Sequence, residues 1–202
     1  MKKGLLIVFE GIDGTGKSTQ LHLLAQYLIN KDYPVITTRE PTDGQYGVKI
    51  RELYVDRDSI SKEQELELFI NDRKEHVEQL IQPALAEHKI ILCDRYFLST
   101  AAYQGAVGFD PQEILNQNSF APDPDLALLF LAKPELSVLR IANRGDALND
   151  FEHQDKLEKV SKLFLSLNKP YILQIDGSGT IESIHQEVVK NVMMLVHKHQ
   201  LS

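Results

Sequence analysis

Short apolar runs alternate along the whole chain with longer segments in which apolar residues recur every three or four positions. A nearly unbroken apolar run is typical of a strand that helices cover on both faces, whereas the longer periodic segments indicate amphipathic helices. The predicted strands are Leu5–Phe9, Val35–Thr38, Ile90–Cys93, Leu126–Leu131 and Tyr171–Ile175. The predicted helices are Lys17–Asn30, Lys62–Glu87, Ser99–Ala106, Pro134–Asn143, Phe151–Leu167 and Ile181–His199.

The order of these elements determines the expected fold class. Strands that alternate with helices predict an α/β protein of three layers, in which a five-stranded parallel sheet with right-handed crossovers is flanked by helices. Because no repeat or linker is found, we expect a single domain over residues 1–202. Two segments fit neither helix nor strand. Pro41–Gly47 is turn-rich and follows a strand, whereas Asn143–Asp150 separates two helices and indicates a short lid at about residues 143–152.

The composition restricts the classes of partner. With 22 Lys and Arg against 29 Asp and Glu, the formal net charge of −7 argues against binding to nucleic acid or to an anionic membrane. The longest apolar stretch, Leu126–Ala132, is far shorter than the roughly 20 residues that span a bilayer. The single cysteine, Cys93, has no partner for an internal disulfide. We therefore expect a cytoplasmic protein in which Cys93 is a buried strand residue.

The segment Gly11–Ser18, with the sequence GIDGTGKS, fits the phosphate-binding pattern G-x4-G-K-[S/T] between a predicted strand and a predicted helix. Its glycines allow backbone N–H groups to turn toward phosphate oxygens, and the helix N-terminus adds partial positive charge. Lys17 would reach the outer phosphates of a nucleoside triphosphate, and the Ser18 hydroxyl could bind Mg²⁺. The motif indicates a fold of the P-loop NTPase type. The expected phosphate-binding residues are Gly11, Asp13, Gly14, Thr15, Gly16, Lys17, Ser18 and Thr19.

Four arginines and one aspartate lie where a triphosphate and an anionic acceptor would meet. Arg39 and Arg95 end or directly follow predicted strands, so they could hold the phosphate of a monophosphate and offset its repulsion by ATP. Arg140 and Arg144, one helical turn apart beside the predicted lid, could stabilise charge on the transferring group. Asp94 ends a strand, the usual position for a carboxylate directed at Mg²⁺. Each of these side chains could instead serve only in an ion pair.

Further motifs extend over nearly the whole chain. They are Phe9–Gln20, Thr38–Pro41 (TREP) with Gly47 and Lys49–Arg51 downstream, Phe69-x3-Arg73, Asp94–Tyr96 (DRY) leading into Ser99–Gly105 (STAAYQG), and Arg140-x3-Arg144-Gly145 with Asp150–Glu152. Together they resemble the thymidylate kinase (dTMP kinase) family. The P-loop alone is generic, whereas TREP combined with DRY and AYQG is specific. The resemblance implies transfer of the γ-phosphate of Mg²⁺-ATP to dTMP, giving ADP and dTDP for dTTP synthesis.

The resemblance also implies roles for individual residues. Phe69 would stack on the thymine ring, and Arg73 would donate to a base carbonyl. Tyr103 would close the space near the sugar 2′ carbon, and Asp13 would meet the 3′-hydroxyl or the metal shell. The acceptor-binding residues are then Asp13, Arg39, Phe69, Arg73, Arg95, Thr100, Tyr103 and Gln104, of which Thr100 and Gln104 would line the base pocket.

Because no basic residue lies between Gly11 and Gly16, the chain resembles the branch of the family that supplies its catalytic arginine from the lid. The expected catalytic residues are Lys17, Arg95, Arg140 and Arg144, and the expected Mg²⁺ ligands are Ser18 and Asp94. The expected partners are ATP and dTMP, with neither nucleic acid nor membrane, and the resemblance suggests a homodimer.

The chain departs from the family pattern at two places. Where the family commonly has Glu-Pro-Gly-Gly-Thr, Glu40–Gly44 reads EPTDG and adds a negative charge near the acceptor phosphate. After the lid, Ser161–Phe164 replaces a frequent Arg-x-x-Tyr.

Two other functions stay open at this point. A deoxynucleoside kinase would phosphorylate a neutral hydroxyl and would need a general base, for which Glu40 is the candidate. A non-catalytic nucleotide-dependent switch would signal through ordering of the lid. A regulatory GTPase is disfavoured, because Asn168–Tyr171 lacks the aspartate of the guanine-reading Asn-Lys-x-Asp motif.

Overall fold

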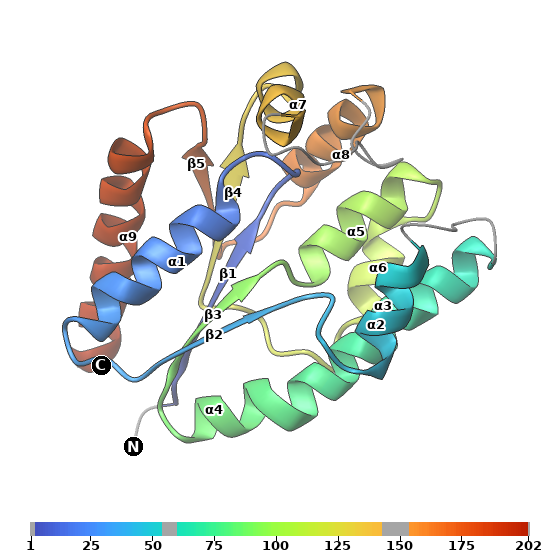
Figure 1. Ribbon diagram of the computed structural model, residues 1–202. Coiled ribbons are helices and arrows are strands. Elements are labelled where there is room, and N and C mark those ends of the chain that lie inside the picture. Colours follow the sequence, from blue (N-terminus) through green and yellow to red (C-terminus); the bar gives the residue numbers. More distant parts are fainter. Residues whose placement is uncertain (1–2, 54–59, 143–153, 202) are drawn as a thin grey trace.

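The computed structural model describes residues 3–53, 60–142 and 154–201 and confirms the predicted fold class (Figure 1). Its five strands are β1 (Leu5–Glu10), β2 (Val35–Arg39), β3 (Ile90–Asp94), β4 (Leu126–Leu131) and β5 (Ile172–Asp176). They pair in parallel in the order β2-β3-β1-β4-β5. Each predicted strand agrees with the observed strand to within one residue at either end.

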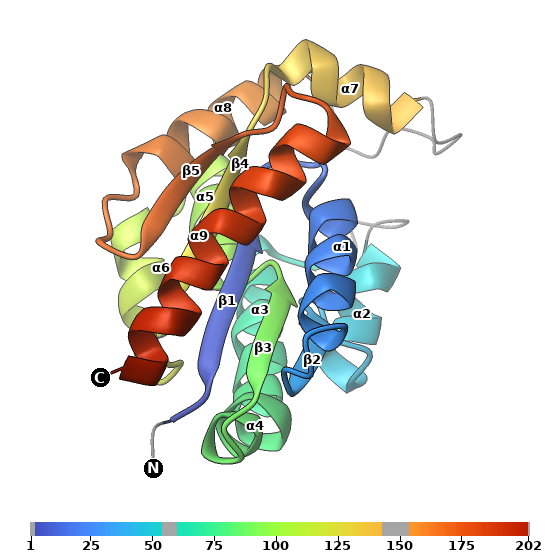
Figure 2. The ribbon, with the colours of Figure 1, turned by 90° about the vertical axis from the view of Figure 1, so that its left-hand side faces the viewer.

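Helices cover both faces of this sheet. On one face lie α1 (Lys17–Ile29) and α9 (Ile181–Leu201), side by side in Figure 2. The other face is covered by α3 (Lys62–His76), α5 (Phe97–Ala106), α6 (Pro111–Gln117) and α8 (Gln154–Ser166), and α7 (Pro134–Ala142) follows β4. Alternate residues of β1 enter the two cores: Ile7 and Phe9 pack toward α1 and α9, whereas Leu6 and Val8 pack toward α5 and α8. This two-sided burial explains why β1 is apolar without interruption.

The two edge strands differ from the prediction that every strand is covered by helices on both faces. β2 and β5 are only partly buried, whereas the inner strands β1, β3 and β4 are almost wholly buried. An edge strand has a neighbour on one side only, so part of its length stays accessible to water. Cys93, on inner strand β3, is fully buried as predicted, and burial raises the pKa of its thiol.

The predicted helical segment Lys62–Glu87 is confirmed to within one residue, but it is not a regular α-helix along its whole length. The structure divides this segment into α3, a π-helical turn η2 (Val77–Ile81) and a short helix α4 (Gln82–Ala86). Pro83 has no N–H for the carbonyl of Gln79, and its ring would collide with that carbonyl in a regular helix. The wider turn of η2 accommodates the proline ring.

The structure contains two helices that the hydrophobic pattern does not predict, α2 (Gln45–Leu53) and α6. Helix α2 begins inside Pro41–Gly47, where we expect neither helix nor strand, so that expectation is wrong from Gln45 onward. A local signal exists for α6: the Asp110 carboxylate accepts a hydrogen bond from the backbone N–H of Gln112 (2.8 Å) and caps the helix. In the described parts of the chain, no helix is both long and apolar enough to cross a membrane.

Candidate active site

The P-loop connects β1 to α1 at the carboxyl edge of the sheet, as predicted. Gly11, Gly14 and Gly16 have positive φ angles of 130°, 79° and 94°. A Cβ atom on Gly11 would lie 2.4 Å from the carbonyl oxygen of Phe130, and one on Gly14 would lie 2.4 Å from that of Ser137. The loop conformation therefore requires glycine at Gly11 and Gly14 for two reasons, backbone torsion and lack of space, and favours glycine at Gly16 for its torsion alone.

Replacing Gly14 by alanine tests this requirement. The new methyl group would overlap the Ser137 backbone. We therefore expect the KM for ATP, the predicted phosphoryl donor, to rise by about tenfold or more, since small displacements of binding groups are costly. Gly108→Ala is the matched control, because Gly108 also has a positive φ angle (117°) but has no atom within 4 Å of the added Cβ. Steady-state kinetics of both variants check the prediction, and an equal KM in the two variants would contradict it.

Lys17 is buried in the first turn of α1, and its Nζ donates to the Ile12 carbonyl oxygen (2.8 Å) inside the loop. Burial, and after it the nearby Arg95, lower the pKa of Lys17 to about 8 against the opposing effect of Asp13. An incoming phosphate would favour the charged ammonium. Lys17 therefore lies where its ammonium group can neutralise the negative charge of bound phosphates.

The remaining predicted phosphate-binding residues line the same loop. The Thr15 hydroxyl donates to the Ile12 carbonyl oxygen (2.8 Å), so it stabilises the loop itself. Thr19 is exposed in the first turn of α1. A cavity of about 740 Å³ extends from these residues past Arg140 to the start of α9 at Ile181. It is large enough for a nucleotide.

The two predicted Mg²⁺ ligands lie together. The Ser18 hydroxyl, at the start of α1, donates a short hydrogen bond to Asp94 Oδ2 at the end of β3. A hydroxyl and a carboxylate are hard oxygen donors that suit Mg²⁺. Within residues 3–53, 60–142 and 154–201 no cluster of three or more His, Cys, Asp and Glu side chains is found. The donor set thus fits an ion that takes one or two protein ligands and completes its shell with phosphate oxygens and water.

Arg95 directly follows Asp94 and adopts a positive φ angle of 70°. Its Nη2 donates to Asp13 Oδ1 (2.6 Å) and to the Tyr103 hydroxyl oxygen (3.3 Å), and its guanidinium lies 5.0 Å from the Tyr103 ring centroid. The Tyr103 hydroxyl donates in turn to Asp13 Oδ2 (3.1 Å). Burial alone would raise the pKa of Asp13, but Arg95 and Lys17 hold it well below its usual value. Three predicted acceptor-binding residues therefore form one charged cluster beside the P-loop.

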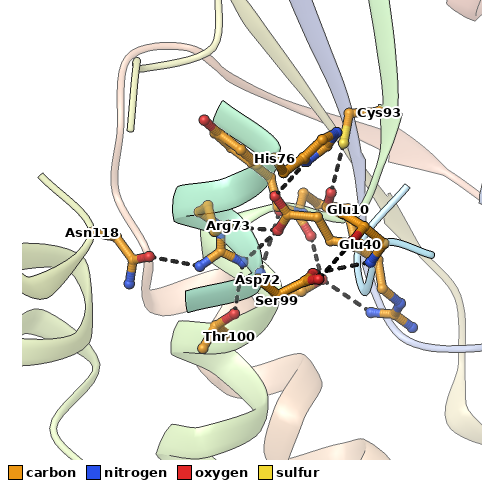
Figure 3. Close-up of polar contacts among 12 residues, drawn as sticks. Glu10, Glu40, Asp72, Arg73, His76, Cys93, Ser99, Thr100 and Asn118 are labelled. Carbon is orange, nitrogen blue, oxygen red and sulfur yellow. Dashed lines mark hydrogen bonds and ion pairs between the residues drawn. The ribbon is translucent and has the colours of Figure 1, made fainter. Parts of the chain in front are cut away.

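Arg73 lies in a second, buried cluster (Figure 3). Its Nε and Nη2 donate to Glu40 Oε2 (2.9 and 2.5 Å), and the two side chains are only 1% and 4% exposed. Nη1 donates to Asn118 Oδ1 (2.6 Å), and Nη2 also donates to Thr100 Oγ1 (3.0 Å). On the other side of the carboxylate, His76 Nδ1 lies 2.9 Å from Glu40 Oε1. Among the described residues, one of the five N–H groups of Arg73, on Nη1, has no acceptor.

The other residues predicted to form the base pocket lie on two helices, α3 and α5. Thr100 is buried on α5 and contacts Arg73 directly. Gln104, one turn further along α5, is fully buried, yet neither atom of its amide has a hydrogen-bond partner among the described residues. Buried amides are normally paired, so this one indicates a ligand or a water molecule. Phe69 is half-buried on α3, one turn before Arg73.

Arg39 lies at the end of β2, opposite Asp94 in the register with β3, as predicted. Its Nη2 donates to Asp43 Oδ1 (2.7 Å), which Arg51 Nη2 also approaches (3.1 Å). The charge added in the EPTDG segment therefore pairs with a predicted phosphate-binding arginine. Arg39 and Asp43 are 61% and 77% exposed, and such exposed pairs are weak. An acceptor phosphate could therefore replace the Asp43 carboxylate at Arg39.

Arg140 lies near the end of α7, beside the P-loop. Its Nη1 donates to the carbonyl oxygens of Gly177 (2.8 Å) and, at a longer distance, Gly14 (3.4 Å). Arg144 and the predicted lid at about residues 143–152 lie outside the described residues. The predicted catalytic set is therefore brought together for Lys17, Arg95 and Arg140.

The residues of this site that were not predicted as part of it include Glu10, Glu40 as a partner of Arg73, His76 and Asn118. Glu40 belongs to the TREP motif, which is a signal for it. Glu10 interrupts the apolar run of the first strand, and a charged residue there is a further signal. Asn118 carries no recognisable signal.

A P-loop between β1 and α1, with arginines gathered at the carboxyl edge of a parallel sheet, defines the class of P-loop nucleotide kinases. A family model described as thymidylate kinase matches residues 9–188. The chain belongs to the thymidylate kinase family.

Curated relatives agree with this assignment. The chain is 54% identical over 194 residues to a thymidylate kinase of Desulfotalea psychrophila, with 96% of each chain covered. It is 43% identical over 207 residues to a probable thymidylate kinase of Pyrococcus horikoshii, with 98% of each covered. It is 45% identical over 181 residues to a thymidylate kinase of Xanthomonas euvesicatoria pv. vesicatoria. That match covers 90% of this chain and 80% of the Xanthomonas protein.

Proposed function

We propose that this chain transfers the γ-phosphate of ATP to dTMP, giving dTDP and ADP. The observation that carries the proposal is the cluster of Arg95, Asp13 and Tyr103 beside Lys17 of the P-loop, in a chain that matches the thymidylate kinase model over residues 9–188. A P-loop binds the donor, and a second cationic group beside it suits an acceptor that is itself a phosphate.

The proposed mechanism relies on positioning and charge neutralisation. An oxygen of the dTMP phosphate is already a competent nucleophile, so no general base is needed. Lys17 and Arg95, which lie close enough for Arg95 to lower the pKa of Lys17, would offset the charge of donor and acceptor. Arg140 at the P-loop edge and Arg144 of the lid would add charge as the lid closes and excludes water.

We propose that Ser18 and Asp94 hold a Mg²⁺ ion. When bound, the ion would supply positive charge to the donor phosphates. Supporting this assignment, the Ser18 hydroxyl and the Asp94 carboxylate are in direct contact at the end of β3.

For the acceptor, we propose that Arg39 and Arg95 hold the phosphate of dTMP. The thymine ring would stack on Phe69 and accept a hydrogen bond from the remaining N–H of Arg73, with Thr100 beside it. The unpaired amide of Gln104 would complete the base pocket. On the sugar side, Asp13 would meet the 3′-hydroxyl and Tyr103 would exclude a 2′-hydroxyl.

Neither alternative function is favoured by the site. A deoxynucleoside kinase would need Glu40 as a general base, but the Glu40 carboxylate is buried and accepts from Arg73 while it contacts His76. A non-catalytic switch would not need Lys17, Arg95 and Asp94 gathered at one edge of the sheet. The phosphotransferase is the function that uses all of these groups.

Four further properties complete the proposal: the family resemblance supports the dimer, the net charge of −7 argues against nucleic acid, and the sequence pattern supports the location and the single domain. We propose a cytoplasmic homodimer of single-domain subunits that binds nucleotides rather than nucleic acid. Size-exclusion chromatography with light scattering checks the dimer, and a monomer at micromolar concentration would count against it.

Release of ADP from Mg²⁺-ATP should depend strongly on dTMP when dTMP, dUMP, dCMP, dGMP, AMP and thymidine are compared. Removal of Mg²⁺ by EDTA should abolish this release, because the donor phosphates would lose their counter-charge. A coupled ADP assay measures both effects. Activity with thymidine alone would move the chain to the nucleoside kinases, and ATP binding without any transfer would favour the switch.

A further inference from the structure

Glu10 is a fully buried carboxylate at the end of β1, directly before the P-loop, and the proposed mechanism assigns it no role. Burial raises the pKa of Glu10 to about 7, against the opposing effects of Ser99 and Arg95. A buried carboxyl group is costly unless hydrogen bonds or charges compensate it. The partners of Glu10 therefore indicate what it does.

Within the part of the chain that the structure describes, the hydrogen-bond donors to Glu10 come from the start of α5. Glu10 Oε1 accepts from the backbone N–H groups of Tyr96 (3.0 Å) and Ser99 (3.3 Å), and Oε2 accepts a short hydrogen bond from the Ser99 hydroxyl (Figure 3). Tyr96 occupies the N-cap position of α5 and supplies no side-chain cap of its own. Glu10 thus caps this helix from a neighbouring strand, and its negative charge is favourable at a helix N-terminus.

The Ser99 hydroxyl connects this cap to Arg95. Ser99 has one O–H group, and its donation to Glu10 leaves the lone pairs of the oxygen for another donor. Arg95 Nη1 occupies that position, because it donates to Ser99 Oγ (3.0 Å) and to the Gly11 carbonyl oxygen (3.3 Å). The direction of the hydroxyl, which Glu10 determines, therefore makes Ser99 an acceptor for Arg95.

The backbone of Arg95 is fixed by the same neighbours. Its N–H donates to the carbonyl oxygen of Phe9 (2.9 Å), the residue before Glu10, and its φ angle is positive. With Nη1 on Ser99 and Gly11, and Nη2 on Asp13 and Tyr103, four of its five N–H groups are held by the protein. Within the described residues, Nε–H is the group of Arg95 that has no acceptor.

We infer that Glu10 and Ser99 are positioning residues for the proposed acceptor-binding arginine: Glu10 orients the Ser99 hydroxyl, and the Ser99 oxygen fixes the guanidinium of Arg95 toward the phosphate of the acceptor. The inference rests on the proposed function, since it concerns the residue proposed to hold the dTMP phosphate. A preorganised guanidinium loses less conformational freedom when the phosphate binds. The expected consequence is a specific effect on the acceptor and not on ATP.

A double-mutant cycle between Ser99 and Arg95 tests this inference. We expect Ser99→Ala to lower kcat/KM for dTMP by about 10- to 100-fold, the range that one hydrogen bond to a charged group provides, with little change in the KM for ATP. In the Arg95→Ala background the same substitution should change kcat/KM by less than about twofold, because its target has been removed. In the Ser99→Ala background, Glu10→Gln should cause no further change in kcat/KM for dTMP, because Glu10 acts on Arg95 through the Ser99 hydroxyl.

The cycle separates positioning from structural damage. An equal effect of Ser99→Ala with and without Arg95 would mean that the hydroxyl acts on the fold alone, and it would overturn the inference while leaving the proposed function intact. If Arg95→Ala itself leaves kcat/KM for dTMP unchanged, the proposed role of Arg95 fails, and the inference fails with it. If Glu10→Gln does not fold, the cycle with Ser99 still decides.

Ser166→Ala is the matched control. Its hydroxyl donates to the Leu163 carbonyl oxygen (2.7 Å) on the exposed end of α8, away from the site. The same loss of one serine hydroxyl there should leave kcat/KM for dTMP and for ATP unchanged, and a decrease equal to that of Ser99→Ala would overturn the inference.

Discussion

Replacing Lys17 by alanine is expected to lower kcat for dTMP phosphorylation by about 10³-fold, or about 4 kcal/mol of transition-state stabilisation. Lys17 is buried inside the P-loop, where water cannot replace its ammonium group in stabilising the negative charge of the phosphates. The same burial disfavours its charged form in the free protein, as the pKa of about 8 shows. Because removal of the side chain also removes this unfavourable charge, the melting temperature should change little. Single-turnover kinetics and thermal unfolding measure the two effects.

The control for this prediction is Lys31→Ala. Lys31 follows α1, and its Nζ lies 5.3 Å from the centroid of the Tyr27 ring, remote from the P-loop. This variant loses a similar positive charge and should retain its full turnover number. Normal turnover in Lys17→Ala would refute the proposed mechanism.

Replacing Glu40 by alanine is expected to destabilise the protein by about 3–5 kcal/mol, the usual effect of removing one partner of a buried ion pair. Arg73 would remain buried, with its charge uncompensated and only Asn118 and Thr100 as hydrogen-bond partners. The KM for dTMP should rise as well, because Arg73 would lose the carboxylate that holds it at the proposed base pocket. Urea unfolding of the wild type and the variant at the same pH measures the change in the free energy of unfolding.

Two variants serve as controls for Glu40→Ala. Asp43→Ala removes a carboxylate of the same loop from the exposed pair with Arg39, and it should leave the free energy of unfolding nearly unchanged. The double variant Glu40→Ala/Arg73→Met should recover much of the loss, because it leaves no unpaired charge in the core. If Glu40→Ala is no more destabilising than Asp43→Ala, the buried pair does not contribute as we argue.

The strands and the P-loop could be predicted from the sequence because their signals are local. The apolar run of β1 and the glycines that follow it depend on neighbours in the chain, on steric limits of φ and ψ, and on burial of both sheet faces. The turn before helix α2 depends on a distant segment, because the N–H and the hydroxyl of Thr42 donate to the Asp72 carboxylate on α3. The π-helical turn η2 has a local signal in Pro83, but a hydrophobic pattern does not detect it.

For the candidate site, the sequence could predict which residue types would meet, but not how their hydrogen bonds would be shared. Asp13, Arg95 and Tyr103 are predicted together and are in contact, although their roles toward dTMP remain proposals. The sequence does not show that most N–H groups of Arg73 donate to Glu40, Asn118 and Thr100. Hydrogen bonds between side chains far apart in the chain leave no periodicity to detect.

By itself, the sequence determined the α/β class, the P-loop and the family, because apolar periodicity and short motifs act over a few residues or are shared with relatives. Only the tertiary structure decided that Glu10 would cap α5 and contact Ser99, and that Glu40 would lie between Arg73 and His76. A buried charge is stable only where several donors converge on it. That convergence depends on how β1, β2, α3 and α5 pack in three dimensions.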